Sequence, residues 1–202
     1  VINVRSLSPN RKRIKILLLS SKKLNVLGGG PGGLFLAILI RTHRPQWEVQ
    51  VWERNPPHAT FGFGVVFSDR TIERLDNADP ILMERIRAEF QSWTDIEIGT
   101  PKGVRRTGGH GFSAIARHRL LAILQQRARE LQVSVLYEHE ALDFDRLYED
   151  CDLLIGADGI NSLVRERWAE EFKPDIRTGS ARFIWFATPR RYDALTFHFV
   201  QT

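Results

Sequence analysis

The sequence predicts an α/β fold: a parallel sheet with flanking helices, followed by the start of a second, mostly antiparallel sheet. An apolar segment at 24–27 predicts a first strand, which runs directly into the glycine-rich turn at 28–33. The apolar stretch from Leu34 predicts a helix that ends before Pro45, because proline disfavours helical geometry in the preceding residue. Alternation over 48–53 predicts a second strand. Strand, helix and strand in this order form a βαβ unit with parallel strands.

The next segment, residues 55–116, is predicted to be an excursion from this sheet. It begins with a loop rich in Pro, Gly and Phe and ends in extended structure. Between these parts, Ser68 can cap a short helix. Asp79 followed by Pro80 is typical of a helix start, and this second helix should end near Phe90.

Later segments return the chain to the parallel sheet. A helix at 119–131 has one apolar face, and a strand at 133–137 follows it. A buried strand at 152–155 opens into the turn at 156–159. Asn161 can cap the helix that comes next.

The two ends of the chain are predicted to lie outside this first domain. Residues 1–22 form a basic leader that we expect to be disordered and exclude from the fold. The first domain therefore spans 23–178. Strands predicted at 182–188 and 195–200 belong to a different sheet, so residues 179–202 are the incomplete start of a second domain.

The net charge of +5 comes from the leader. Residues 1–23 hold seven basic and no acidic residues, so the remaining 179 residues carry a net charge of −2. This distribution argues against a nucleic-acid partner and favours a solvated tail over a transit peptide. The longest apolar run, Leu34 to Ile40, has seven residues, against about 18 for a membrane span. One cysteine and no secretory signal leave the cytoplasm as the default location.

The glycine-rich turn has the spacing of a pyrophosphate-binding motif. In Gly28-x-Gly30-x-x-Gly33 the first glycine permits a tight turn, the second lets a pyrophosphate approach, and the third lets helix and strand pack closely. The helix N-terminus presents unpaired N–H groups to the anion. Glu53 ends the second strand twenty residues after Gly33, where a carboxylate can bind a ribose. The turn therefore predicts an adenine dinucleotide, with a loose turn as the alternative.

A second motif separates FAD from NAD. Residues 152–165, which read DLLIGADGINSLVR, match at every defined position the Asp-Gly fingerprint of the FAD-dependent aromatic hydroxylases, and the chain resembles that family. The resemblance implies a Rossmann-like FAD-binding fold and places Asp158 and Gly159 near the cofactor pyrophosphate. It also implies NAD(P)H as co-substrate. The alternative is an ordinary strand, turn and capped helix.

An arginine at a helix start is the third point of resemblance. Arg117-x-x-Leu120-x-x-x-Leu124 is similar to the family's arginine beside the flavin. An arginine there opposes the helix dipole, which favours a bound anion as its reason. Arg119 is the competing choice, and a surface arginine is the alternative. The candidate cofactor-binding residues are Gly28, Gly30, Pro31, Gly32, Gly33, Glu53, Arg54, Arg117, Asp158 and Gly159.

Two loops narrow the resemblance within the family. Phe61–Asp69 and Gly108–Phe112 look like those of hydroxylases that act on aromatic acyl-CoA thioesters, the salicylyl-CoA and anthraniloyl-CoA enzymes. The short connection 142–152 and the segment 183–188 are similar to that branch and to the tryptophan-derivative hydroxylase of violacein synthesis. The arginine that benzoate-type relatives often carry has no counterpart at 61–66.

The resemblance implies a monooxygenase reaction. In it NAD(P)H reduces FAD, O2 adds at the flavin C4a position, and the hydroperoxide hydroxylates a small aromatic molecule or aryl-CoA. The cofactor performs this chemistry, so no side chain is nominated as catalytic. A dehydrogenase or reductase on the same scaffold is one alternative. Because the chain resembles only the N-terminal half of such an enzyme and lacks the family's later Gly-Asp motif, an inactive truncated fragment is another.

Other chemistries have no matching spacing. None of the six histidines forms a metal-ligand pair such as H-E-x-x-H, and no G-x-S-x-G motif occurs. We therefore expect no metal site. His110 should serve as a structural hydrogen-bonding group, and the thiol of Cys151 should be inert.

Overall fold

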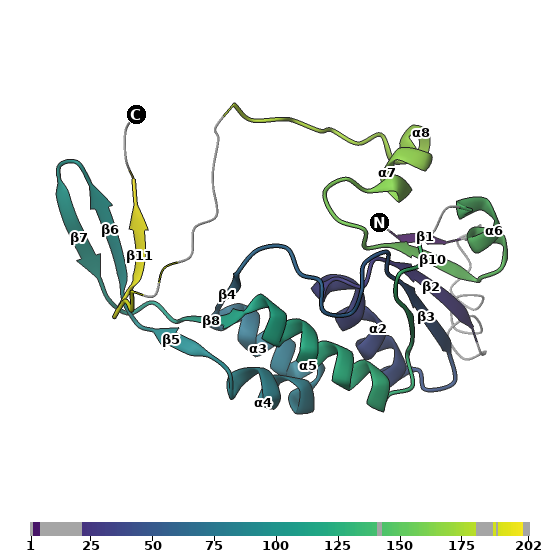
Figure 1. Ribbon diagram of the computed structural model, residues 1–202, viewed down its shortest axis with the longest axis horizontal. Helices are drawn as coiled ribbons and strands as arrows, with labels where there is room; N and C mark the ends of the chain where they lie inside the picture. The colour runs from purple at the N-terminus through teal and green to yellow at the C-terminus, as the bar shows by residue number, and fades with distance from the viewer. Residues whose placement is uncertain (1, 5–21, 141–142, 181–187, 189, 200–202) are drawn as a thin grey trace, which may run out of the picture. The chain divides into compact units, whose positions relative to one another are not determined.

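The computed structural model describes residues 2–4, 22–140, 143–180, 188 and 190–199, and the chain forms two compact units (Figure 1). Unit 1 comprises Val1–Ala59 and Leu121–Ser180, and unit 2 comprises Thr60–Leu120 and Ala181–Thr202. Helix α5 (Arg117–Glu130) belongs partly to each unit. Each unit is therefore built from two segments that lie far apart in the sequence.

A five-stranded sheet forms the centre of unit 1. In spatial order its strands are β1 (Ile2–Val4), β10 (Leu153–Gly156), β2 (Lys23–Leu27), β3 (Glu48–Trp52) and β9 (Ser134–Leu136). All except β1 run parallel, which confirms the predicted parallel sheet. Leu27 lies opposite both Trp52 and Gly156, so the carboxyl ends of β2, β3 and β10 meet at one edge of the sheet. Ligands of doubly wound α/β folds bind at this edge.

The strand β1 corrects one prediction. The exclusion of residues 1–22 from the fold is too broad, because Ile2–Val4 pair antiparallel with β10. The outer edge of β10 carries backbone groups that need partners, and an extended segment of any composition can supply them. Lys22 is also engaged, since its Nζ lies 3.0 Å from Asp152 Oδ1. Residues 5–21 lie outside the described part of the chain.

Apolar layers cover both faces of this sheet. On one face, helix α2 (Pro31–His43) packs against β2 and β3. The buried side chains of these three elements are Leu24, Val26, Val49, Val51, Leu34, Ala37 and Ile38. The other face carries the short helices α6 (Phe144–Glu149), α7 (Leu163–Arg167) and α8 (Ala169–Phe172). Its buried cluster contains Leu27, Cys151, Leu154, Val164 and Trp168. Burial on both faces is what parallel strands require.

The described residues of unit 2 form two three-stranded sheets and two helices that belong to this unit alone. The first sheet is antiparallel, in the order β4 (Gly64–Ser68), β8 (Phe112–Ala116) and β5 (Gln91–Trp93). The second has the order β11 (Leu195–His198), β6 (Ile96–Thr100) and β7 (Gly103–Thr107). Over the described residues of both units, no helix is long and apolar enough to cross a membrane.

Both helices of unit 2 begin at the predicted caps. Ser68 Oγ accepts a hydrogen bond from the Thr71 N–H at 3.4 Å and starts α3 (Asp69–Ala78). Asp79 Oδ1 accepts one from the Leu82 N–H at 3.0 Å and starts α4 (Pro80–Arg87). A capping side chain satisfies N–H groups that have no partner within the helix.

The strand β11 brings the end of the chain to the predicted excursion. It pairs parallel with β6, so the second sheet is mixed, with one parallel and one antiparallel pairing. Arg106 holds the approach to β11, because its guanidinium lies 2.7 Å from Asp95 Oδ2 and 3.1 Å from Asp193 Oδ2. The sequence divides the chain after residue 178, whereas the structure groups the excursion with the tail. Of the strand predicted at 182–188, only Thr188 is among the described residues.

Candidate functional site

Gly28 and Gly33 are required by the backbone around them. Gly28 has a φ of +108°, and a Cβ there would lie 2.3 Å from the carbonyl oxygen of Ala157. A Cβ on Gly33 would lie 2.0 Å from the carbonyl oxygen of Gly28. Neither position admits a side chain unless the backbone moves. The predicted tight turn and close helix–strand contact are therefore confirmed.

The remaining glycines leave the start of α2 open. A Cβ added to Gly30 or Gly32 would meet nothing within 4 Å. Gly30 is the N-cap of α2, Pro31 follows it, and no side-chain hydrogen bond caps this end among the described residues. The first-turn amides of a helix carry a partial positive charge and bind anions when no side chain caps them. The open space and the uncapped amides together suit a pyrophosphate.

Glu53 lies directly beside this turn. Its Oε2 accepts a hydrogen bond from the Gly29 N–H at 2.7 Å. Its Oε1 accepts two from Asn55, from the backbone N–H at 2.8 Å and from Nδ2 at 2.7 Å. A carboxylate has about four acceptor positions, so these bonds orient it and still leave room for a ribose hydroxyl. Asn55 is absent from the sequence-based candidates, although an asparagine just after a strand is typical of such local turns.

The residues that follow β10 lie beside the glycine turn. The Ala157 N–H donates to the carbonyl oxygen of Leu27 at 2.7 Å. A Cβ built on Gly28 would lie 2.9 Å from Asp158 N and one built on Gly29 would lie 2.9 Å from Glu53 Cβ. The glycine turn, Glu53 and the start of the Asp-Gly segment therefore lie together, at the edge where three parallel strands end.

The carboxylate of Asp158 is used within its own loop. Its Oδ1 accepts a hydrogen bond from Ser162 Oγ at 2.6 Å, and its Oδ2 accepts one from the Leu163 N–H at 2.7 Å. The cap of α7 is Ser162, whose Oγ accepts from the Arg165 N–H at 3.0 Å, so the prediction of Asn161 as the cap is wrong. The Ser162 hydroxyl, one residue after Asn161, reaches the Arg165 N–H because its hydrogen bond to Asp158 holds it there.

The surroundings of Gly159 and Arg54 give less support for their predicted role in cofactor binding. Gly159 is exposed and has a φ of +87°, a conformation that favours glycine. Arg54 is exposed, and no hydrogen bond or ion pair joins it to another described residue. Both remain predictions.

The two competing arginines, both in unit 2, have different surroundings. Arg119 forms a two-point hydrogen-bonded pair with Glu89, and this bond lowers the pKa of the Glu89 carboxyl below its usual value. Arg117 makes no ion pair among the described residues, and its Nε is buried without a hydrogen-bond partner there. Buried polar groups nearly always have a partner. Arg119 is thus paired with Glu89, whereas the Nε of Arg117 has no partner among the described residues. The role of Arg117 stays a prediction.

The structure also describes the surroundings of His110, predicted to be a structural hydrogen-bonding group, and of Cys151, predicted to be inert. The backbone N–H of His110 donates to the Thr94 carbonyl oxygen at 2.9 Å, and its Nε2 lies 3.4 Å from Thr107 Oγ1. Cys151 is buried, and burial raises the pKa of its thiol, which therefore stays protonated near neutral pH. In the described part of the chain, no group of three or more His, Cys, Asp or Glu could hold a metal ion.

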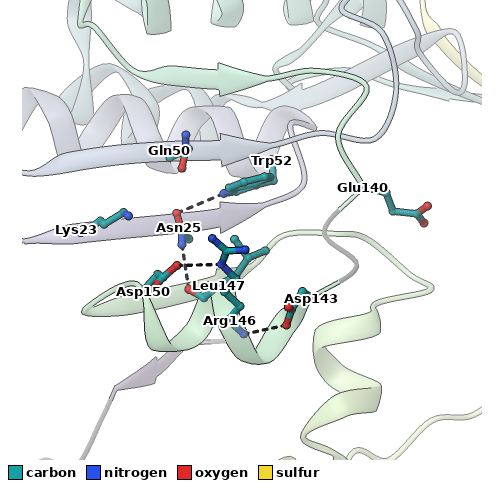
Figure 2. Close-up of a pocket in the computed structure, with 9 residues that line it drawn as sticks. All are labelled: Lys23, Asn25, Gln50, Trp52, Glu140, Asp143, Arg146, Leu147 and Asp150. Carbon is teal, nitrogen blue, oxygen red and sulfur yellow. Dashed lines mark hydrogen bonds and ion pairs between the residues drawn. The ribbon is translucent and has the colours of Figure 1, made fainter.

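Unit 1 also contains a polar pocket of about 530 Å³ that contains none of the candidate cofactor residues (Figure 2). It is lined by Lys23, Asn25, Gln50, Trp52, Glu140, Asp143, Arg146, Leu147 and Asp150. The buried Asn25 donates to the Leu147 carbonyl oxygen at 3.0 Å and accepts from Trp52 Nε1 at 3.3 Å, as Figure 2 shows. The polar atoms of Asn25 are thus already paired. The charged side chains of the lining have both signs, so the pocket favours neither an anionic nor a cationic ligand.

Comparison with curated proteins finds aromatic monooxygenases. The chain is 45% identical over 175 residues to a salicyloyl-CoA 5-hydroxylase from a Streptomyces species, covering 87% of the chain and 34% of that protein. It is 27% identical to a 3-hydroxy-4-methyl-anthranilyl-[aryl-carrier protein] 5-monooxygenase from Streptosporangium sibiricum, covering 89% of the chain and 50% of that protein. It is 26% identical to protodeoxyviolaceinate monooxygenase from Chromobacterium violaceum, with 88% and 48% covered. The chain thus spans between a third and half of the length of these relatives.

Solved structures share the fold. PqsL from P. aeruginosa in complex with 2-aminobenzoylacetate matches 80% of the chain and 48% of its own, with a TM-score of 0.60 and 20% sequence identity. A mutant of 2-methyl-3-hydroxypyridine-5-carboxylic acid oxygenase matches 59% of the chain and 32% of its own, with a TM-score of 0.52 and 20% identity. No family model matches the chain.

Proposed function

Because the chain belongs to the family of FAD-dependent aromatic hydroxylases, we propose that it forms the FAD-binding part of a monooxygenase that hydroxylates an aromatic substrate. The observation that carries the proposal is the meeting of the glycine turn, Glu53 and the Asp158 segment at one sheet edge. This edge offers amides for a pyrophosphate and a carboxylate for a ribose, the two groups that an adenine dinucleotide presents side by side.

The residues present fit the cofactor. The space outside Gly30 and Gly32 admits phosphate groups, and the uncapped first turn of α2 supplies N–H donors and a favourable dipole. Glu53, already oriented by Gly29 and Asn55, would accept hydrogen bonds from the ribose diol. By the resemblance alone, Arg117 would supply a guanidinium beside the flavin. Arg54 and Gly159 complete the proposed set on the strength of the resemblance.

When bound, FAD would supply the redox chemistry, accepting a hydride from NAD(P)H and activating O2 so that one oxygen atom enters the aromatic ring. The side chains described here bind and orient the cofactor, and none is assigned a proton transfer. The names of two relatives contain an aryl group joined to CoA or to an aryl carrier protein. We therefore propose an aromatic acyl thioester as the substrate class.

A binding titration tests the proposal directly. The chain is titrated with FAD and, separately, with ADP, and binding is followed by flavin fluorescence and by calorimetry. We expect both to bind, and Gly30→Val to weaken both, because the new side chain would fill space that the phosphates need. A chain that binds neither ligand, with far-UV circular dichroism typical of a folded α/β protein, would refute the proposed function.

The alternative activity, a dehydrogenase or reductase, uses the same cofactor site, so binding does not separate the two. Analysis of the product formed under 18O2 with NADH or NADPH separates the two activities. Hydroxylated product carrying the label supports the monooxygenase, whereas reduction without oxygen insertion supports the alternative.

A further inference from the structure

One face of the second sheet of unit 2 carries exposed apolar side chains. The sheet consists of β11, β6 and β7 (Figure 1). Phe197 of β11 lies opposite Ile98 of β6, so their side chains share one face. Ile98 is 37% exposed, Phe197 46% and Phe199 59%. Large apolar side chains that gather on a surface are typical of a site that another molecule covers. We refer to the face with these three residues as the phenylalanine face.

The segment that carries the two rings is anchored to β6. The Phe199 N–H donates to the carbonyl oxygen of Gly99 at 2.9 Å, so the pairing with β6 continues past the end of β11. His198 lies against Gly99, where a Cβ would be 2.6 Å from His198 Nδ1. Because side chains alternate along a strand, Phe197 and Phe199 both lie on the face opposite His198. Their exposure is therefore a property of a hydrogen-bonded strand.

The strand β7 adds positive charge to the phenylalanine face. Arg105 lies opposite Ile98, is exposed, and forms no ion pair with another described residue. Arg106, on the opposite face, is in contrast held by two aspartates. Lys102, in the turn before β7, is exposed, and its Nζ has no partner in the described part of the chain. The strand positions on the phenylalanine face include no acidic residue: they are Ile96, Ile98, Thr100, Gly103, Arg105, Thr107, Leu195 and Phe197.

We propose that the phenylalanine face binds the adenine nucleotide end of coenzyme A. The adenine would stack on Phe197, and phosphate groups would pair with Arg105 and Lys102. Aromatic side chains on an open sheet face are known to stack nucleic bases, and base–aromatic stacking does not depend on the identity of the base. Arginine pairs with phosphate through two parallel hydrogen bonds, which makes it a favoured phosphate ligand.

This inference rests on the proposed function, whose substrate class is an aromatic acyl thioester. Such a thioester is carried either by CoA, which has a nucleotide, or by a carrier protein, which has the pantetheine arm without one. A nucleotide site on the chain therefore selects the CoA thioester.

Other occupants match only part of the phenylalanine face. An apolar protein segment would cover the rings but would take water away from Arg105 without supplying a partner. Inorganic phosphate would pair with Arg105 and leave the rings exposed. An acidic protein surface matches the charge without requiring a planar ring on Phe197, so the loss of stacking separates it from a nucleotide.

The experiment compares ligands with and without the nucleotide. The full chain is first saturated with FAD, so that the adenine nucleotides cannot bind at the glycine turn. It is then titrated by calorimetry with CoA, adenosine 3′,5′-bisphosphate and pantetheine. We expect CoA and the bisphosphate to bind, and pantetheine to bind at least about tenfold more weakly than CoA. Equal affinities for CoA and pantetheine, or binding of neither CoA nor the bisphosphate, would overturn the proposal. Failure to bind FAD would contradict the proposed function instead, and the CoA titration is then made without FAD.

Two variants place the nucleotide on the phenylalanine face. Phe197→Ala removes the stacking ring and Arg105→Gln removes a phosphate-pairing cation, and each should weaken CoA by about tenfold. Phe197→Trp keeps a stacking ring and should retain CoA affinity. FAD affinity should stay unchanged in all three variants, and far-UV circular dichroism shows whether each is folded.

The matched controls lie elsewhere in unit 2. Val104→Ala changes a residue that is 63% exposed on the opposite face of β7, and Arg70→Gln removes an exposed arginine of α3. Neither should change CoA affinity. A loss in Arg105→Gln without a loss in Phe197→Ala would show that charge alone holds the ligand and would contradict the proposal. Equal losses in the controls and the two test variants would contradict it as well.

Discussion

The glycine turn of unit 1, residues 28–33, and the loop at residues 60–63 of unit 2 differ in how far their polar groups are satisfied. At the turn the groups that face a ligand are backbone amides and a carboxylate held by three hydrogen bonds. At the loop and the neighbouring start of α5 there are two exposed rings, Phe61 and Phe63, and two buried polar atoms without partners among the described residues, Thr60 Oγ1 and Arg117 Nε. The turn is therefore already satisfied internally, apart from its uncapped amides, while the loop is not. Substitutions that crowd the backbone at Gly28 or Gly33 should therefore damage the fold.

The largest effect is expected at the turn. Gly33→Ala would place a methyl group 2.0 Å from the Gly28 carbonyl oxygen. We expect it to lower the free energy of unfolding by about 3 kcal/mol, the upper range for overpacking, and to abolish FAD binding. Urea denaturation followed by circular dichroism measures the first effect. Gly32→Ala, whose Cβ would meet nothing within 4 Å, is the control and should keep full stability. Equal losses for both variants would contradict the close packing.

Glu53→Gln should weaken binding next most strongly. It replaces a charged acceptor of ribose hydrogen bonds by a neutral one, at about 1.5–3 kcal/mol, or roughly tenfold to a hundredfold in Kd for FAD and ADP alike. Glu48→Gln, an exposed residue at the other end of the same strand, is the matched control. Calorimetric titration separates the two. An unchanged ADP affinity in Glu53→Gln would remove Glu53 from the site.

The two arginines should behave differently in the same assay. Arg117→Gln should raise the Kd for FAD by about tenfold, because a charge-assisted hydrogen bond is lost. Arg119→Gln breaks only the exposed pair with Glu89 and should leave FAD affinity unchanged. Fluorescence titration of both variants measures the difference. The reverse order of effects would make Arg119 the cofactor-binding arginine.

The start of α7 should respond at a smaller scale. Ser162→Ala removes the N-cap and should lower the free energy of unfolding by about 1 kcal/mol. Asn161→Ala should change it by no more than about 0.5 kcal/mol, as expected for a surface position without such a role. Thermal and urea denaturation of the pair test the assignment. A larger loss for Asn161→Ala would restore the cap predicted from the sequence.

The smallest effect concerns acid stability. The hydrogen bond from the Lys23 backbone N–H, assisted by Lys22, lowers the pKa of Asp152 below its ordinary value. A depressed folded-state pKa adds stability above the unfolded-state pKa, and this stability is lost as the pH falls through the folded-state pKa. Asp152→Asn should therefore be less stable than wild type at pH 7, by less than about 1 kcal/mol because the Asp152 side chain is exposed to solvent. The difference should vanish near pH 2, and a difference that persists there would contradict an ionic origin.

Much of unit 1, and the starts of both helices of unit 2, follow from local patterns. The order of strand, glycine turn, helix and strand predicts the βαβ unit, because only glycine suits the φ of Gly28 and the contact at Gly33. Ser68 and Asp79 cap their helices as predicted, since an N-cap bond spans three residues and is visible in a short window. The position of Glu53 beside the turn follows for the same reason, because its distance along the chain from the turn reflects one helix and one strand.

Local patterns could not show pairings between distant segments. The contact of Ile2–Val4 with β10 depends on a free strand edge, and basic composition carries no information about it. The pairing of β11 with β6 joins residues about a hundred positions apart, and it assigns the tail to unit 2. The pairing of Arg119 likewise depends on Glu89, which lies in the turn between α4 and β5.

The sequence by itself determined the parallel sheet, the glycine turn and the acidic residue beside it, because glycine geometry and the βαβ order are properties of short stretches of chain. Only the tertiary structure decided which edge strand closes the sheet, which arginine has a partner, and which rings and polar atoms remain without one. Each of these depends on what other segments supply, and hydrogen-bond partners and burial exist only once the chain has folded.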